Sequence, residues 1–247
     1  MVATGLGLAM VTLQAGIGAA NDLVDAPRDA GHKPGKPIPA GLVSRHTARH
    51  VVVVAFAVGF VLAGVSGGTA ALTIALIGVA IGLAYDLRLK GTAWSWVPFA
   101  AGVPLLPVFG WAGASGRLPV AFLILVPAAF AAGAALAIAN AFVDIERDRA
   151  AASGSIALAL GPSTARLINV GLVLAVGLAA VASVVSLGGP ASGSAAVAVA
   201  ALLPVGAAVA AWGGGATRRE RAWELEAVGV AVLAVAWLLA VLPDMPL

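Results

Sequence analysis

Two polar motifs interrupt an otherwise apolar sequence, and each contains regularly spaced carboxylates. Residues 21–29 read NDLVDAPRD and residues 140–148 read NAFVDIERD, so the two motifs are identical at five of nine aligned positions. Both follow the pattern N-x-x-x-D-x-x-x-D. A spacing of four residues predicts that the three polar side chains of each motif lie on one face of a helix.

Carboxylates crowded at a membrane boundary repel one another and are costly to desolvate, so they require cations. Magnesium prefers hard oxygen ligands and often bridges one or two carboxylates to phosphate oxygens. The candidate metal ligands are Asp22, Asp25, Asp29, Asp144 and Asp148. Basic residues near the motifs could neutralise phosphate directly, and they are Arg28, Lys33, Lys36, Lys90 and Arg147. In an apolar chain, these two sets favour a lipid diphosphate as the ligand.

Other interpretations of the polar residues remain open at this point. Charged residues at helix ends can be solvated caps, although a motif repeated in each half of the chain disfavours that. Asn21 and Asn140 can be hydrogen-bonding residues at helix ends. A transporter or lipid-binding protein that uses the acidic motifs as an ion site is a second hypothesis. It predicts acidic residues near the bilayer midplane, whereas here they lie beside a basic loop.

The composition indicates a membrane protein. Of the 247 residues, 61% are hydrophobic and 10% charged, whereas soluble domains average roughly 25% charged residues. The chain has 0 cysteines, which excludes disulfides, thiolate metal sites and cysteine nucleophiles. The formal charge is +3. No Lys/Arg cluster lies on a soluble domain, so we expect no nucleic-acid partner.

The predicted fold is all-α, a multi-pass bundle of about eight transmembrane helices around a central cavity. The apolar segments are continuous and close to the length of about 20 residues that a spanning helix needs. The predicted spans are residues 2–22, 48–65, 69–86, 94–112, 118–143, 166–187, 191–212 and 223–242. Ser66-Gly67-Gly68 predicts a tight turn between the second and third spans.

Loop charge predicts the orientation of these spans. With alternating loops, all of the 14 Lys and Arg residues except Arg117 fall on one side, as do all of the 11 acidic residues except Asp244. Cytoplasmic loops carry an excess of Lys and Arg. We therefore expect an integral plasma-membrane protein whose motif loops are cytoplasmic and whose two termini lie on the opposite side.

The similarity of the two halves extends beyond the motifs. Thr47-Ala48-Arg49 follows the first motif, and Thr164-Ala165-Arg166 follows the second. We infer a single domain over residues 1–247 made of two four-helix pseudo-repeats, roughly 1–113 and 118–247. An even number of helices gives both repeats the same orientation, which would bring the two acidic faces to one end of a central cavity.

These residues resemble the signatures of the UbiA superfamily of intramembrane prenyltransferases. The first motif, followed by Lys36-Pro37-Ile38-Pro39-Ala40-Gly41, is similar to its first signature. Asp144-x-x-x-Asp148 with Gly154 and Leu160-Gly161 resembles its second. Tyr85-Asp86-x-Arg88-x-Lys90 resembles a short motif that usually reads Tyr-Ser with a nearby Lys.

The resemblance implies transfer of a prenyl group from a prenyl diphosphate to an acceptor, such as an aromatic or hydroxyl-bearing lipid precursor, with Mg²⁺ as cofactor. It implies metal ligation by Asn21, Asp25, Asp144 and Asp148, assisted by Asp22 and Asp29. Asn140, which aligns with Asn21 in the second motif, is a further candidate ligand. It also implies that Arg28, Lys36 and Lys90 contact the diphosphate and that Tyr85 lies near the reacting carbon. Tyr85 and Lys90 are therefore the predicted catalytic residues.

The chain also departs from the family pattern. Only residues 1–20 precede the first motif, where the family has two helices, so we expect the first of the nine family helices to be absent. Asp86 stands where a small hydroxyl residue is usual, and Ser155-Ile156 replaces the usual Thr-Leu. These changes bear on the choice of acceptor. A family member without activity, serving in assembly, is a third hypothesis.

Overall fold

The computed structural model describes residues 1–31, 33 and 35–241, and these residues form helices and connecting loops without a strand. The predicted all-α class is confirmed. The helices are α1 (Val2–Asp29), α2 (Arg45–Ala84), the π-helix η1 (Tyr85–Leu89), α3 (Trp96–Ser115), α4 (Phe122–Val143), α5 (Ile145–Ala150), α6 (Ile156–Leu160), α7 (Pro162–Ser186), α8 (Ala191–Ala210), the 3₁₀-helix η2 (Ala211–Gly213) and α9 (Ala216–Val241). Residue 242, which ends the last predicted span, and Asp244 lie outside the described residues.

Seven helices in the described part of the chain are long and apolar enough to cross a membrane. One of them, Arg45–Leu89, has 45 residues. A straight helix of that length would extend about twice the thickness of the hydrocarbon core. This helix contains both predicted spans 48–65 and 69–86, so a reversal must divide it.

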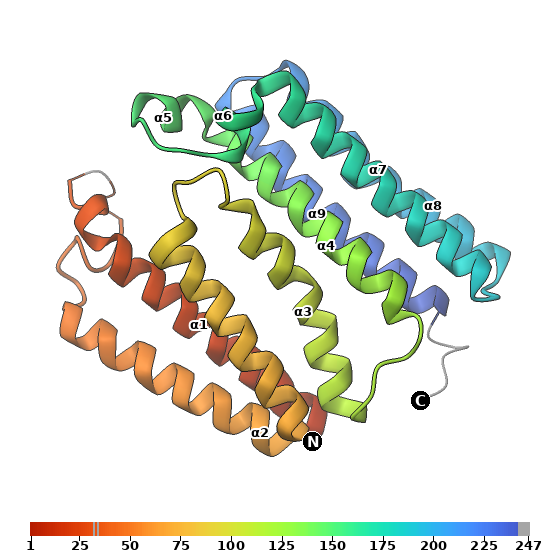
Figure 1. Cartoon of the computed structure of the whole chain (residues 1–247), viewed down its shortest axis with the longest axis horizontal. Helices are drawn as coiled ribbons and strands as arrows, with labels where there is room; N and C mark the ends of the chain where they lie inside the picture. The colour runs from red at the N-terminus through yellow and green to blue at the C-terminus, as the bar shows by residue number, and fades with distance from the viewer. Residues whose placement is uncertain (32, 34, 242–247) are drawn as a thin grey trace. The chain divides into compact units, whose positions relative to one another are not determined.

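Gly68 makes that reversal. Its φ of 64° and ψ of −159° interrupt the helical conformation inside α2. A Cβ atom on Gly64 would lie 3.8 Å from Leu72 Cδ2, although residues eight apart in a straight helix are separated by about 12 Å. The turn predicted from Ser66-Gly67-Gly68 is therefore present, and α2 consists of two legs, as Figure 1 shows.

Replacing Gly68 with alanine is expected to destabilise the protein by about 1–3 kcal/mol, because this region of φ and ψ is essentially restricted to glycine. A Cβ atom at Gly68 would meet nothing within 4 Å, so the cost is conformational. Gly18 is the matched control: it is exposed within α1 and its Cβ position is also open. Gly18→Ala should be neutral or stabilising. Unfolding in detergent micelles measures both, and equal stabilities would contradict the assignment of the turn.

The described chain divides into two compact units. The first comprises Met1–Lys90 and Leu105–Leu118, and the second comprises Gly91–Pro104 and the chain from Pro119 onward. In the first unit, α1 packs against both legs of α2 through small residues. A Cβ on Gly59 would lie 2.6 Å from Leu13 of α1, and a Cβ on Gly82 would lie 3.2 Å from Ile17. Glycine at these positions lets the helices approach closely.

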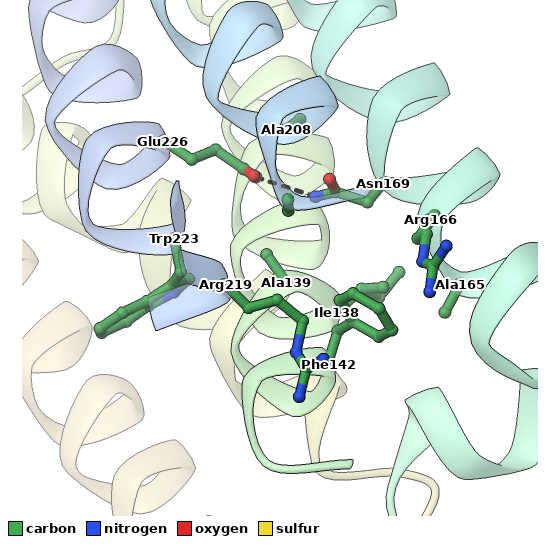
Figure 2. Close-up of a pocket in the computed structure, with 11 residues that line it drawn as sticks. Ile138, Ala139, Phe142, Ala165, Arg166, Asn169, Ala208, Arg219, Trp223 and Glu226 are labelled. Atoms are coloured by element: carbon green, nitrogen blue, oxygen red, sulfur yellow. Dashed lines mark hydrogen bonds between the residues drawn. The ribbon is translucent and has the colours of Figure 1, made fainter. Parts of the chain in front are cut away.

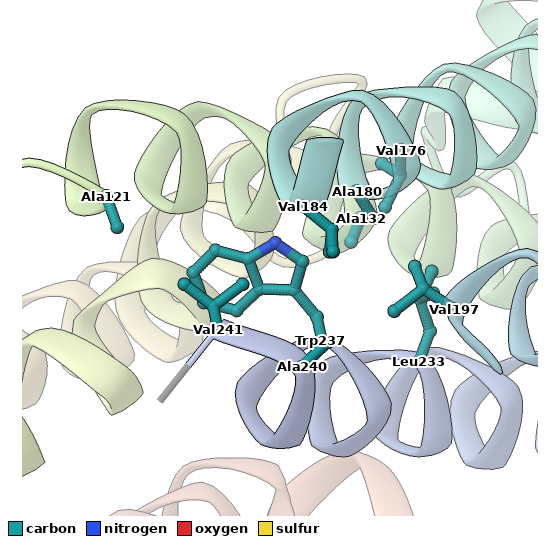
Figure 3. Close-up of a cluster of buried hydrophobic side chains, with 10 residues drawn as sticks. All are labelled: Ala121, Ala132, Val176, Ala180, Val184, Val197, Leu233, Trp237, Ala240 and Val241. Carbon is teal, nitrogen blue, oxygen red and sulfur yellow. The ribbon is translucent and has the colours of Figure 1, made fainter. Parts of the chain in front are cut away.

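The second unit is built around α4, α7, α8 and α9. Its core contains Val184, Val197, Leu233 and Trp237, which come from α7, α8 and α9 (Figure 3). The indole Nε1 of Trp237 donates a hydrogen bond of 2.6 Å to Ser183 Oγ. This bond satisfies the one polar atom of the largest side chain in the cluster, as a buried indole requires.

Candidate active site

The first motif lies at the end of α1, which continues from the apolar span through the motif to Asp29. Asp25 is 7% exposed and Asp29 is 5% exposed, whereas Asp22 is half-buried. The four-residue spacing therefore places Asp25 and Asp29 on a common helix face, as expected. Two carboxylates one helical turn apart lie on the buried side of a helix end, and such groups need a cation or a hydrogen-bond donor.

Each aspartate of the first motif pairs with its own lysine. Lys33 Nζ lies 2.9 Å from Asp29 Oδ1. Lys36 pairs with Asp22, and Lys90 pairs with Asp25. The hydrogen bond to Asp22 raises the pKa of the Lys36 ammonium above its ordinary value. Three of the basic residues predicted to contact diphosphate are thus at the motif, while Arg28 is exposed on α1.

The π-helix η1 brings the third predicted motif to the same place. Lys90 N donates to Tyr85 O at 2.9 Å, which closes a turn one residue wider than an α-helical turn. Lys90 Nζ lies 5.8 Å from the centre of the Tyr85 ring while it pairs with Asp25. Asn21 Nδ2 donates to Asp86 Oδ1 at 2.5 Å. Residues 21–25 of α1 and 85–90 therefore form one polar cluster in the first unit.

The oxygen donors of this cluster suit a hard cation. Among the described residues, no three His, Cys, Asp or Glu side chains form a group that could hold a metal. Each of the three aspartates of α1 pairs with an ammonium. One buried carboxylate oxygen in the cluster, Asp86 Oδ2, has no hydrogen-bond partner. Buried carboxylates and an orphaned oxygen fit a divalent cation such as Mg²⁺.

The second motif differs from the first because its helix is interrupted. Asp144 has φ −93° and ψ 6° and separates α4 from the short helix α5. The expectation of one uninterrupted helical face is correct for the first motif only. Arg147 Nη2 lies 3.1 Å from Asp144 Oδ1, and the Arg147 side chain is 73% exposed. Asn140 is half-buried on the last turn of α4.

Asp148 lies where α5 meets the following loop. Burial raises the pKa of its carboxyl above the ordinary value, against the opposing effects of a hydrogen bond with Ser155 and the charge of Arg147. Ser155 also accepts a bond from Leu158 N at 3.4 Å and so caps α6. Gly154 N donates to Gly91 O at 3.0 Å, which holds the loop after the motif.

A second polar cluster lies in the second unit, and the sequence analysis did not predict it. A pocket beside α4, α7 and α9 is lined by Phe142, Arg166, Asn169, Arg219, Trp223 and Glu226 (Figure 2). Asn169 Nδ2 donates to Glu226 Oε1 at 2.9 Å and to Ala135 O at 3.0 Å. An ionisable residue inside a spanning helix is a signal of function or of specific pairing, so Glu226 in an apolar span was the available clue.

Arg219 connects this cluster to the second motif. It is 7% exposed, pairs with Glu146 of α5 and donates from Nη1 to Gly214 O at 3.2 Å. Its Cζ lies 5.0 Å from the centre of the Phe142 ring, and Arg166 Cζ lies 4.7 Å from the same ring. Arg219 therefore holds α5 against the start of α9, which makes it a positioning residue for Asp144 and Asp148.

Replacing Arg219 with glutamine should loosen α5. Amide hydrogen exchange over residues 144–150 is expected to become about tenfold faster or more, since a hydrogen bond to a charged group contributes roughly 1.5–3 kcal/mol. Arg218 is exposed and supplies the control. Arg218→Gln should leave exchange in α5 unchanged. The same exchange rate in both variants would show that Arg219 does not position the motif.

Comparison with known proteins identifies the family. Residues 2–230 match the model of the UbiA prenyltransferase family. The chain belongs to the UbiA prenyltransferase family and is an integral membrane protein. A comparison with curated proteins gave no match.

Solved structures with a similar fold cover most of the chain. A UbiA homolog from Aeropyrum pernix K1 has 22% sequence identity and a TM-score of 0.76, covering 97% of this chain and 90% of that one. A structure from work on digeranylgeranylglyceryl phosphate synthase in membranes has 16% identity and a TM-score of 0.78, covering 97% and 85%. A UbiA homolog from Archaeoglobus fulgidus bound to GPP and Mg²⁺ has 18% identity and a TM-score of 0.73, covering 96% and 87%.

Proposed function

We propose that this protein transfers a prenyl group from a prenyl diphosphate to a nucleophilic acceptor within the membrane and that it requires Mg²⁺. The observation that carries the proposal is the cluster at the end of α1. It combines buried carboxylates with lysines that can bind phosphate. Membership of the UbiA prenyltransferase family and the GPP and Mg²⁺ bound to the Archaeoglobus fulgidus homolog support it.

In the proposed reaction, the bond between the allylic carbon and the diphosphate oxygen breaks, and the diphosphate leaves with the electron pair. The acceptor carbon or oxygen then bonds to the allylic carbon and loses a proton. When bound, Mg²⁺ supplies positive charge to the diphosphate oxygens. Lys33, Lys36 and Lys90 add charge-assisted hydrogen bonds, and exposed Arg28 and Arg147 attract the diphosphate. The apolar spans keep water from the carbocation.

We propose that both aspartate motifs hold this metal-bound diphosphate. The metal-binding residues would be Asn21, Asp22, Asp25, Asp29, Asn140, Asp144 and Asp148. The repeat of the pattern N-x-x-x-D-x-x-x-D, with one copy in each half of the chain, supports a shared site. Tyr85, beside Lys90, would face the reacting carbon.

The orientation of the site in the membrane is part of the proposal. Basic loops favour the cytoplasmic side, so the motifs would face the cytoplasm of a plasma-membrane protein, with both chain ends on the opposite side. The diphosphate group of the substrate would then reach the site from the cytoplasm, and its apolar prenyl tail would reach it from the bilayer. Whole-cell labelling of single cysteines placed in the motif loops tests this orientation.

The function is tested by incubating the purified protein in nanodiscs with Mg²⁺, membrane lipid extract and radiolabelled prenyl diphosphates of several chain lengths. The proposal predicts label in a lipid product together with release of inorganic pyrophosphate, and loss of both with EDTA. Diphosphate that binds without any product would instead support the inactive assembly role, and uptake into proteoliposomes without product would support transport.

A further inference from the structure

Asp86 is a buried acidic residue of the polar cluster formed by residues 21–25 and 85–90. The family signature does not explain why it is there. It is 6% exposed in the first turn of η1. One carboxylate oxygen, Oδ1, accepts a hydrogen bond of 2.5 Å from Asn21 of the first motif. The other oxygen, Oδ2, is buried and has no partner among the described residues. A buried carboxylate with one unsatisfied oxygen is costly unless a cation or donor reaches it.

The position of Asp86 is set by two matched pairs of side chains. Asn21 and Asp25 are one turn apart on α1, and Asp86 and Lys90 are four residues apart across η1. Asn21 bonds to Asp86, and Asp25 pairs with Lys90. The carboxylates of Asp25 and Asp86 thus lie in adjacent pairs. A π-helical turn at such a place is frequent at functional sites.

We propose that Asp86 is an additional cation ligand, whose Oδ2 joins the oxygens of Asp25 and Asn21 in a magnesium site within the first unit. This inference rests on the proposed function and adds a carboxylate where the family pattern has a small hydroxyl residue. A cation at this place replaces the Lys90 ammonium as the partner of Asp25. Lys90 is then released to contact the diphosphate, so metal loading prepares the cluster for its substrate.

Metal binding without turnover tests the inference. Mn²⁺ serves as the probe in an electron paramagnetic resonance titration of the purified full chain, and thermal unfolding is followed with EDTA and with Mg²⁺. Asp86→Asn keeps an oxygen that accepts from Asn21, and Asp86→Ser restores the hydroxyl of the family pattern. Both variants should raise the dissociation constant for Mn²⁺ roughly tenfold or more, since even loss of an indirect ligand contact costs 10–100-fold. Glu224→Gln removes an exposed carboxylate of α9 and is the control.

The two roles of Asp86 give opposite results in EDTA. A metal ligand is a liability without metal, so Asp86→Asn, which keeps the hydrogen bond from Asn21, should unfold at the same temperature as the unmodified protein or higher. Mg²⁺ should raise the unfolding temperature of both variants by less than half as much as it does for the unmodified protein. Lower stability in EDTA together with unchanged Mn²⁺ affinity would show that Asp86 has only a structural role. That outcome would leave the proposed prenyl transfer intact. If the unmodified protein binds no Mn²⁺, both this inference and the magnesium requirement of the proposed function are wrong.

Discussion

Replacing Asp25 or Asp144 with alanine is expected to lower the rate of prenyl transfer at least about 1,000-fold, which corresponds to roughly 4 kcal/mol of transition-state stabilisation. The reason is electrostatic. Removing either carboxylate removes a ligand for the cation that neutralises the departing diphosphate, and a metal ion supplies several kcal/mol of such stabilisation. Asp25 is also buried against Lys90, so the variant leaves that ammonium without its partner. Product formation in nanodiscs, normalised to folded protein, measures the effect.

Two controls separate chemistry from folding. Glu224 is exposed, and Glu224→Gln should retain full activity. Asp25→Asn keeps the shape of the side chain but not its charge, so it should fold like the unmodified protein and still lose most of the activity. If Asp25→Ala or Asp144→Ala transferred prenyl groups at the unmodified rate, the assignment of the metal ligands would be wrong.

Replacing Trp237 with alanine is expected to destabilise the second unit by about 3–5 kcal/mol, the usual cost of truncating a buried aromatic residue to alanine. Trp237 is 4% exposed, and its indole bonds to Ser183. Truncation leaves a void among α7, α8 and α9 and removes packing contacts that lipid cannot replace. Because the proposed metal ligands Asp144 and Asp148 lie in the same unit, activity should also be lost at a lower temperature.

Trp212 offers a matched comparison for this prediction. It lies in η2 and is 42% exposed. Trp212→Ala should therefore change stability far less than Trp237→Ala does. Unfolding by denaturant in mixed micelles gives the free energy of unfolding of both variants. Similar losses for the two would mean that the cluster around Trp237 does not contribute in the way its burial indicates.

Local features of the fold were accessible from the sequence. Continuous apolar runs gave the spans, because a helix crossing the hydrocarbon core has few alternatives. Ser66-Gly67-Gly68 predicted the reversal inside α2, since glycine tolerates a positive φ, and Gly68 has a φ of 64°. The four-residue spacing of Asn21, Asp25 and Asp29 predicted that they share one helix face, because this arrangement requires only a regular helix.

Contacts between residues far apart in the sequence were not accessible. Lys90 reaches Asp25 and Asp86 reaches Asn21 across 65 positions, and Asn169 reaches Glu226 across 57. The sequence supplied charged residues near each motif, but long side chains can reach several partners, so the pairing depends on helix packing. The π-helical turn at Tyr85–Leu89 also has no spacing signature. Asp86 was therefore interpreted as an influence on the acceptor, whereas its contacts are with the first motif.

We propose that the two aspartate motifs serve one diphosphate site, and cross-linking between the motifs tests this directly. The chain has 0 cysteines, so paired substitutions can be introduced without background. Val24→Cys with Arg149→Cys pairs an exposed residue of the first motif with one directly after the second, and Val24→Cys with Ser186→Cys, at the far end of α7, is the control. A shared site predicts efficient cross-linking of the first pair by a short thiol reagent, increased by Mg²⁺ and a non-hydrolysable prenyl diphosphate analogue. Cross-linking of the first pair no better than the control, with or without these ligands, would contradict it.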